Sequence, residues 1–71
     1  GTQGGAELDL LVLKDSRKLG FEIKYTDSPK ITRSMHIAIE DLKLDNLTIV
    51  IPGKSSFKLA ENIDVLGIES F

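Results

Sequence analysis

The fold of this chain is decided by the stretch GAELDLLVL at residues 5–13 and its continuation LGFEIKY at residues 19–25. From Leu8 to Tyr25 the apolar residues alternate with other residues at a period of two, which is typical of a half-buried β-strand. The polar residues 14–18 separate the two runs and include turn formers. The sequence therefore predicts a β-hairpin that turns at Asp15 and Ser16, or over residues 14–17.

Either turn gives the same register, in which apolar residues face each other across the hairpin. The facing pairs are Leu8 with Ile23, Leu10 with Phe21 and Val12 with Leu19. A slip of one residue would move these side chains to opposite faces, so burial selects this register. The other face then carries the pairs Glu7 with Lys24 and Asp9 with Glu22, and, nearer the turn, Leu11, Gly20, Leu13 and Lys18.

Asp9 and Glu22 face each other in this register, and their like charges destabilise the hairpin unless a proton or a cation lies between them. Two carboxylates aimed at one point suit Mg²⁺ or Mn²⁺, with Lys24 beside them to stabilise or activate a reacting group. The alternative is a solvated strand face, on which a cross-strand Glu–Lys pair contributes about 0.2–1 kcal/mol. The residues alone leave both interpretations open.

An Asp on one strand followed by Glu-Ile-Lys on the next resembles the Asp…(Glu/Asp)-x-Lys signature of the PD-(D/E)XK nuclease superfamily. The matching residues are Asp9, Glu22 and Lys24. Over nearly the whole chain the sequence also resembles the C-terminal domain of unknown function found on many bacterial and archaeal AAA-type ATPases. This second resemblance rests on GAELDLL at residues 5–11, FEIKY at residues 21–25 and SPKITRSM at residues 28–35.

The resemblance implies a truncated restriction-endonuclease-like core with Asp9, Glu22 and Lys24 as its catalytic set. It also implies Mg²⁺ or Mn²⁺ held by Asp9, Glu22 and the backbone carbonyl of Ile23, with Lys24 positioning water. Members of the superfamily carry an upstream helix that often adds a further acidic ligand, so we expect this chain to lack one layer. Further candidates are Glu7 as an accessory acid, and Lys30 and Arg33 as phosphate contacts near a helix N-terminus.

The segment after the hairpin predicts one helix. Ser28 followed by Pro29 is a helix-start signal, and Thr32 is a rival N-cap. Apolar residues at helical spacing continue to about Leu44, and Asn46 can take the left-handed conformation that ends a helix. We therefore expect the helix over about residues 32–44.

The rest of the chain predicts further strands. The run LTIVI at residues 47–51 is β-branched and apolar, as in a strand buried on both faces. Residues 57–59 predict a short extended or turn segment at one edge, and residues 63–68 predict a last strand. A right-handed crossover places the helix on the face of Leu10 and Phe21, with the buried strand parallel to the second hairpin strand. The predicted fold class is α/β (α+β), with one helix on one face of a mixed three- to five-stranded sheet in the order ββαβ(β)β.

We expect residues 1–5 to be a flexible lead-in and residues 6–71 to be a single nuclease-like domain, excised from a longer ATPase. The net charge of −2 and the pI near 5.2 oppose strong nonspecific binding of nucleic acid by this piece alone. The absence of Cys fits a reducing cytoplasm, and no apolar run approaches the roughly 20 residues of a membrane span. These features predict a cytoplasmic domain with no membrane partner.

Two functions follow from these features. The first is divalent-metal-dependent hydrolysis of phosphodiester bonds in DNA or RNA, carried by Asp9, Glu22 and Lys24. The second is a non-catalytic recognition or regulatory module, with the upstream ATPase domain of the same chain as its partner. The net charge, the small size and the expected missing layer favour the second function for this piece, which we expect to be inactive alone. The retention of all three residues favours the first function for the intact protein.

Overall fold

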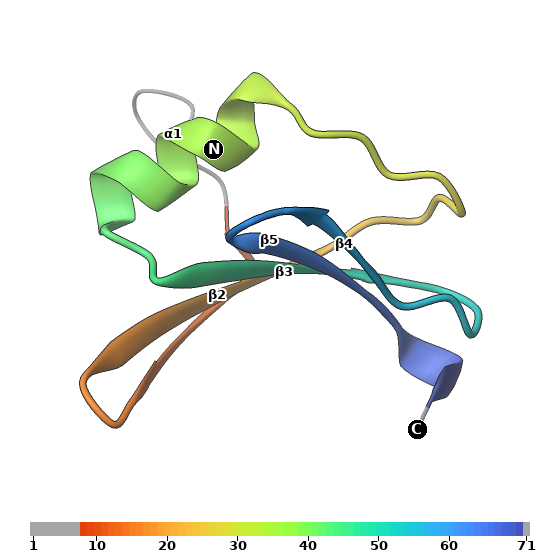
Figure 1. Cartoon of the computed structure of the whole chain (residues 1–71), viewed down its shortest axis with the longest axis horizontal. Helices are drawn as coiled ribbons and strands as arrows, with labels where there is room; N and C mark the ends of the chain where they lie inside the picture. The colour runs from red at the N-terminus through yellow and green to blue at the C-terminus, as the bar shows by residue number, and fades with distance from the viewer. Residues whose placement is uncertain (1–7, 71) are drawn as a thin grey trace.

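The computed structural model describes residues 8–70 as a five-stranded mixed sheet with one helix on one side of it (Figure 1). The strands lie in the order β1-β2-β3-β5-β4, with the central strands β2, β3 and β5 parallel and both edge strands antiparallel to their neighbours. This confirms the predicted mixed sheet, and the elements follow one another along the chain in the predicted order ββαβ(β)β. In chain order the elements are β1 (Leu10–Lys14), β2 (Arg17–Ile23), α1 (Arg33–Leu42), β3 (Asn46–Ile51), β4 (Phe57–Ala60), β5 (Ile63–Gly67) and the short 3₁₀ helix η2 (Ile68–Ser70).

The predicted hairpin and most of its register are confirmed. Asp15 and Ser16 form the two-residue turn, and both have positive φ angles, of 53° and 66°, as a type I′ turn requires. Leu10 faces Phe21 across β1 and β2, and Val12 faces Leu19. The twist of this turn matches the twist of the two strands, so the turn alone holds the register close to its tip.

The predicted pairing fails at the open end of the hairpin, where the chain bulges at Asp9. The backbone N–H of Asp9 donates to the carbonyl of Phe21 at 3.0 Å, although Leu10 is the residue that faces Phe21. Two successive residues of one strand therefore oppose a single residue of the other, which is a β-bulge. The expected pairs of Leu8 with Ile23 and Asp9 with Glu22 are wrong, because alternation does not continue across a bulge.

Leu8 shows the effect of this bulge on the packing. A Cβ atom added to Gly20 would lie 2.9 Å from a methyl carbon of Leu8 and 2.7 Å from one of Leu44. Leu8 therefore packs on the face of Gly20 against the core, and not on the face of Leu10.

The helix covers the opposite face of the sheet from the one that the sequence predicted. Because paired residues share a face, the buried residues of β2, β3 and β5 all lie on one side, which we call the helix face. Met35 and Ala38 of α1 complete this core and are fully buried. The buried strand residues of the helix face are Gly20, Glu22, Leu47, Ile49, Ile51, Ile63, Val65 and Gly67.

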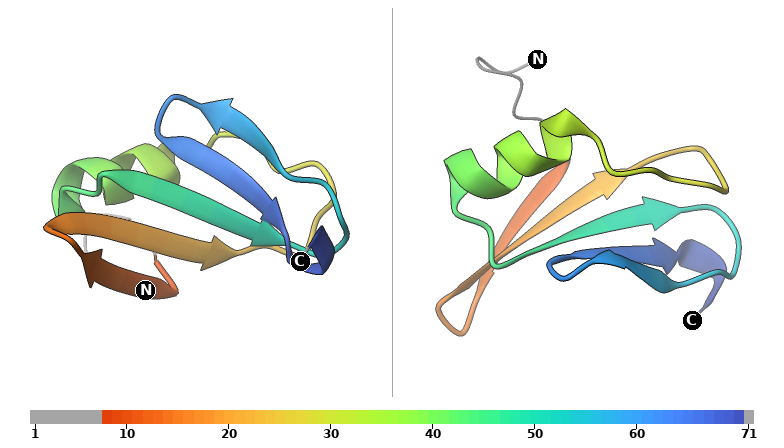
Figure 2. Two further views of the ribbon diagram at one scale, coloured as in Figure 1. Left: turned by 60° about the horizontal axis from the view of Figure 1, so that its bottom comes forward. Right: turned by 45° about the horizontal axis from the view of Figure 1, so that its top comes forward.

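The other side of the sheet, which we call the outer face, carries the apolar residues that the helix was expected to cover. None of its side chains is buried, and Leu10 and Ile23 are 56% and 52% exposed. The views in Figure 2 show α1 on the far side of the sheet from this face. The apolar members of the outer face are Leu10, Val12, Leu19, Phe21, Ile23, Val50 and Leu66.

The helix lies within the predicted range of about residues 32–44, and it ends at Leu42, two residues before the predicted end. Thr32 is the N-cap, and its side-chain oxygen accepts from the amide of Met35 at 3.3 Å, so the Ser28-Pro29 start signal is overridden by its rival. The left-handed residue at the other end is Lys43, with φ of 56°, and Asn46 instead opens β3. In residues 8–70, no helix is long and apolar enough to cross a membrane.

Gly67→Ala is expected to lower the free energy of unfolding by about 1–3 kcal/mol, the usual cost of overpacking. A Cβ atom at Gly67 would lie 2.6 Å from the carbonyl oxygen of Ser55 and 2.7 Å from that of Gly53, and this backbone cannot rotate away. Gly20→Ala is the matched control, because its Cβ atom would meet only the ends of two leucine side chains. Urea unfolding of both variants tests this, and an equal or larger cost for Gly20→Ala would contradict it.

Candidate functional site

Glu22 of β2 and Lys24, one residue beyond the end of that strand, form an ion pair on the helix face. The Lys24 Nζ lies 3.0 Å from Oε2 of Glu22, and the two residues share a face because they are two positions apart. Glu22 is only 7% exposed, while the Lys24 side chain is 36% exposed and reaches solvent. The backbone of Lys24 is held in turn by a 2.9 Å hydrogen bond from its amide to the carbonyl of Val50. Of the predicted catalytic residues, the structure thus brings this pair into contact.

The second carboxylate oxygen of Glu22 is buried without a partner. No side chain or backbone group of residues 8–70 donates to Oε1. A buried polar atom left unpaired costs about 1–3 kcal/mol, and more when the group is charged. Glu22 is therefore a half-satisfied buried carboxylate, and it marks the position where a further donor or a cation would stabilise the fold.

Asp9 closes the open end of the hairpin rather than facing Glu22. Its Oδ2 accepts a 2.7 Å hydrogen bond from the backbone N–H of Ile23, the last residue of β2, and its side chain is exposed. The predicted ligand set included the carbonyl of Ile23, but the group that contacts Asp9 is the amide. The carboxylate of Asp9 thus takes the place of the backbone carbonyl that would accept from Ile23 if the strand pairing continued past the bulge.

The other predicted site residues lie apart from this pair. Within residues 8–70, no three acidic or His side chains come together as a metal-binding group, and Glu7 lies outside the described residues. Lys30 is exposed before the helix, and Arg33 is exposed at the first position of α1. In the described part of the chain, neither residue forms a hydrogen bond or an ion pair with Glu22 or Lys24.

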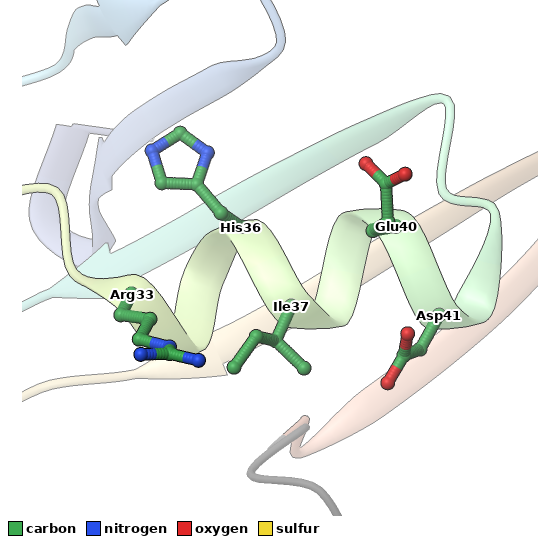
Figure 3. A pocket seen from close by; sticks show the side chains of 5 residues that line it. All are labelled: Arg33, His36, Ile37, Glu40 and Asp41. Atoms are coloured by element: carbon green, nitrogen blue, oxygen red, sulfur yellow. The ribbon is translucent and has the colours of Figure 1, made fainter.

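Arg33 lies instead at one end of a shallow hollow on the exposed side of α1, with a volume of about 400 Å³. Figure 3 shows its lining side chains in two rows, with Arg33, Ile37 and Asp41 at successive helical turns and His36 and Glu40 beside them. All five come from a single helix. Enclosed ligand sites draw side chains from several elements, so this surface offers no convergent binding groups.

Sequence reasoning missed the polar contacts that attach the end of the helix to the sheet. The backbone of Lys18 forms two hydrogen bonds with Asp45. Its N–H donates to the side-chain oxygen Oδ2 of Asp45 at 2.7 Å, and its carbonyl accepts from the backbone amide of Asp45 at 2.8 Å. The Lys18 ammonium also donates to the carbonyl of Leu42 at 3.2 Å, at the negative end of the helix dipole. The sequence signal for these contacts was the position of Asp45, directly after the predicted helix and before the β-branched run of residues 47–51.

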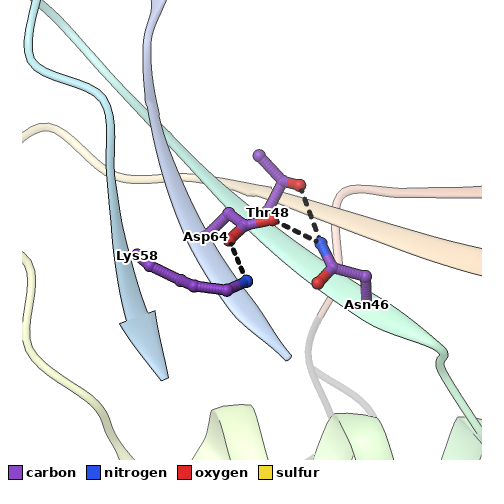
Figure 4. A network of polar contacts seen from close by, with 4 residues as sticks. All are labelled: Asn46, Thr48, Lys58 and Asp64. Atoms are coloured by element: carbon purple, nitrogen blue, oxygen red, sulfur yellow. Dashed lines mark hydrogen bonds and ion pairs between the residues drawn. The ribbon is translucent and has the colours of Figure 1, made fainter. Parts of the chain in front are cut away.

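A second missed network lies on the outer face, across β3, β5 and β4 (Figure 4). Asp64 accepts from Lys58 at 2.9 Å and from the side-chain amide of Asn46 at 3.1 Å. The same Asn46 amide donates to the hydroxyl of Thr48 at 3.4 Å. These four polar side chains satisfy one another next to the apolar part of the outer face.

Over residues 1–71 the sequence matches the family described as Domain of unknown function (DUF4143). The chain belongs to this family. It is also 50% identical over 62 residues to an uncharacterized protein of Mycobacterium bovis and to one of Mycobacterium tuberculosis. These matches cover 87% of this chain but only 14% of each relative, so the chain spans a small part of the length of the proteins it resembles. No solved structure matches the chain.

Asp9→Ala is expected to speed amide hydrogen exchange at Ile23 about tenfold, which corresponds to a loss of roughly 1.4 kcal/mol of local protection. Asp9→Asn is the control, because its side-chain oxygen can still accept from this amide although a carboxylate ligand is lost. Exchange at Leu19, within the ladder, should be unchanged in both variants. An Ile23 amide that exchanges equally fast in the wild type and in Asp9→Ala would show that Asp9 does not hold the hairpin end.

Proposed function

We propose that this domain is a nuclease-like module of a larger ATPase-type protein, and that it serves recognition or regulation rather than phosphodiester hydrolysis. The observation that carries the proposal is the burial of Glu22, at 7% exposure, in an ion pair with Lys24 on the helix face. A carboxylate that binds a catalytic metal needs open coordination positions for water and for the phosphate of the substrate. Glu22 in this setting is a structural carboxylate.

The nuclease-like part of the proposal rests on the arrangement of β2. Glu22 lies in the second hairpin strand and pairs with Lys24 just beyond its end. This strand is followed by a helix and a parallel strand, in keeping with a truncated restriction-endonuclease-like core. The ATPase part rests on the resemblance of residues 5–35 to C-terminal domains of AAA-type ATPases. It is supported by the two mycobacterial relatives, because the matched region is only 14% of the length of each and leaves room for further domains. The partner in this proposal is the ATPase domain of the same polypeptide, in the cytoplasm.

The unpartnered Oε1 of Glu22 favours a second candidate, hydrolysis of DNA or RNA with Mg²⁺ or Mn²⁺ in the intact protein. Glu22 and Asp9 would be the acidic ligands, with the carbonyl of Ile23 completing the set. One carboxylate oxygen of Asp9 already accepts from the amide of Ile23, and one carboxylate oxygen of Glu22 is paired with the ammonium of Lys24. Only part of a ligand set is thus available in residues 8–70, so at least one more ligand has to come from outside them. Glu7 is a candidate for it, as Lys30 and Arg33 are for phosphate contacts.

The two candidates differ in the expected activity of the intact polypeptide. We expect no Mg²⁺- or Mn²⁺-dependent cleavage of single- or double-stranded DNA or of RNA above the level of the Glu22→Gln variant. Amide signals of residues 22–24 should also stay unmoved when Mg²⁺ is added to millimolar concentration. Cleavage that Glu22→Gln abolishes, together with metal-dependent shifts at these amides, would establish the second candidate instead.

Glu22→Gln is also expected to lower the free energy of unfolding by about 1–2 kcal/mol in EDTA, the scale of a charge-assisted hydrogen bond. Asp64→Asn is the matched control, because the Asp64–Lys58 pair is exposed, with side chains 41% and 60% accessible. An exposed pair contributes only about 0.2–1 kcal/mol, so this control should cost less. Denaturant unfolding of both variants measures this difference in the free energy of unfolding. A Glu22→Gln variant as stable as the wild type would count against a structural carboxylate.

A further inference from the structure

The outer face of the sheet is an apolar surface without a second layer. Its apolar side chains run along β1 and β2 and cross to β3 and β5, since Ile23 faces Val50 and Val50 faces Leu66. The three central strands β2, β3 and β5 are parallel, and sheets made of parallel strands alone are almost always covered on both faces. In residues 8–70 the one α-helix lies on the helix face, so these residues supply no helix to cover the outer face.

The two ends of this surface differ in chemistry. At the turn end, Lys14 faces Arg17 on the outer face, and both are exposed. Like charges directly opposite each other are destabilising, so an acidic group placed over them relieves the repulsion. At the other end, an apolar hollow of about 310 Å³ opens beside Ile23 and Val50. Its remaining lining residues are Tyr25, Ile51, Pro52 and Ile68.

We propose that the outer face docks an amphipathic helix supplied by the same polypeptide outside residues 1–71. One side of this helix is apolar, an acidic residue at one end meets Lys14 and Arg17, and a large apolar side chain at the other end fills the hollow beside Ile23. The distance to be covered is the length of β2, about 20 Å at 3.3 Å per residue. A helix of roughly 13 residues spans it.

The length of the relatives supports a partner in the same chain. In both mycobacterial proteins the matched region is 14% of the length, so each relative has ample further chain to supply a helix. A second copy of this chain fits less well, because Asp64 is the one carboxylate on the outer-face strand positions and it is already paired with Lys58 at 2.9 Å. The inference rests on the larger polypeptide of the proposed function but not on the absence of catalysis, so an active nuclease would leave it standing.

The test uses two cysteine variants of the intact polypeptide on opposite faces of β1. Leu10→Cys lies on the outer face, and Leu13→Cys lies on the other face, with wild-type exposures of 56% and 70%. Similar exposure predicts similar labelling by a soluble maleimide if nothing covers the outer face. With the proposed helix in place, Leu10→Cys should label at least about tenfold more slowly than Leu13→Cys. Peptide mapping restricts the readout to these two positions, and equal labelling rates would overturn the proposal.

A photo-crosslinker on Leu10→Cys then identifies what covers the face. The expected product joins it, within one polypeptide, to a segment outside residues 1–71 that is apolar at helical spacing and acidic near one end. A crosslink to a second copy, to a different protein or to a segment without that pattern overturns the proposal. Lys14→Glu combined with Arg17→Glu should raise the labelling rate of Leu10→Cys several-fold, whereas Lys54→Glu, in the exposed β3–β4 loop, should not. If the double variant and Lys54→Glu changed the labelling rate equally, the proposed contact of an acidic residue with Lys14 and Arg17 would be wrong.

Discussion

The packing of α1 onto Leu47, Ile49 and Ile51 is the constraint on which the rest of the structure depends. These three side chains are at most 1% exposed, and full burial of an aliphatic side chain contributes about 1.5–3 kcal/mol. The opposite face of β3 carries Asn46 and Thr48, whose burial under a helix without hydrogen bonds would cost free energy. The central strands therefore decide which face the helix covers, against the preference of the hairpin, whose larger apolar row lies on the other side.

This competition explains how much of the fold the sequence predicts. The hairpin register near the turn follows from alternation and turn chemistry, which are local, and the parallel crossover follows from the right-handed rule for strand-helix-strand connections. The side of the sheet on which the helix lies is not local, because the hairpin and β3 favour opposite faces. Gly20 was the signal that could have decided it, since a glycine within a strand marks a close approach, here by Leu44 and Leu8. The bulge at Asp9 could not be predicted, because the apolar alternation of the sequence continues through residues 8–10 without a break.

The same constraint changes the meaning of the Glu-x-Lys motif. On an open face, Glu22 and Lys24 would be accessible to a metal and a phosphate. Alternation continued one residue past the end of β2 correctly predicts that they lie side by side. On the helix face the carboxylate is buried, at 7% exposure, and the ammonium lies 3.0 Å from it as its counter-ion. A motif of two residues on one strand reports their spacing and shared face, but not their exposure, which the packing of distant segments determines. Burial and not spacing is thus the property that distinguishes the two candidate roles of Glu22.

Two features of the described residues remain incompletely satisfied, and they lie on opposite faces of the sheet. The Oε1 of Glu22 lacks a donor on the helix face, and the apolar row of Leu10, Phe21 and Ile23 lacks cover on the outer face. A single added layer cannot serve both, because the sheet lies between them. A helix docked on the outer face would bury apolar surface and leave Oε1 as it is, whereas a donor or cation for Oε1 has to approach from the side of α1. Cover for the outer face and a partner for the carboxylate of Glu22 are therefore physically separate, and either can be present without the other.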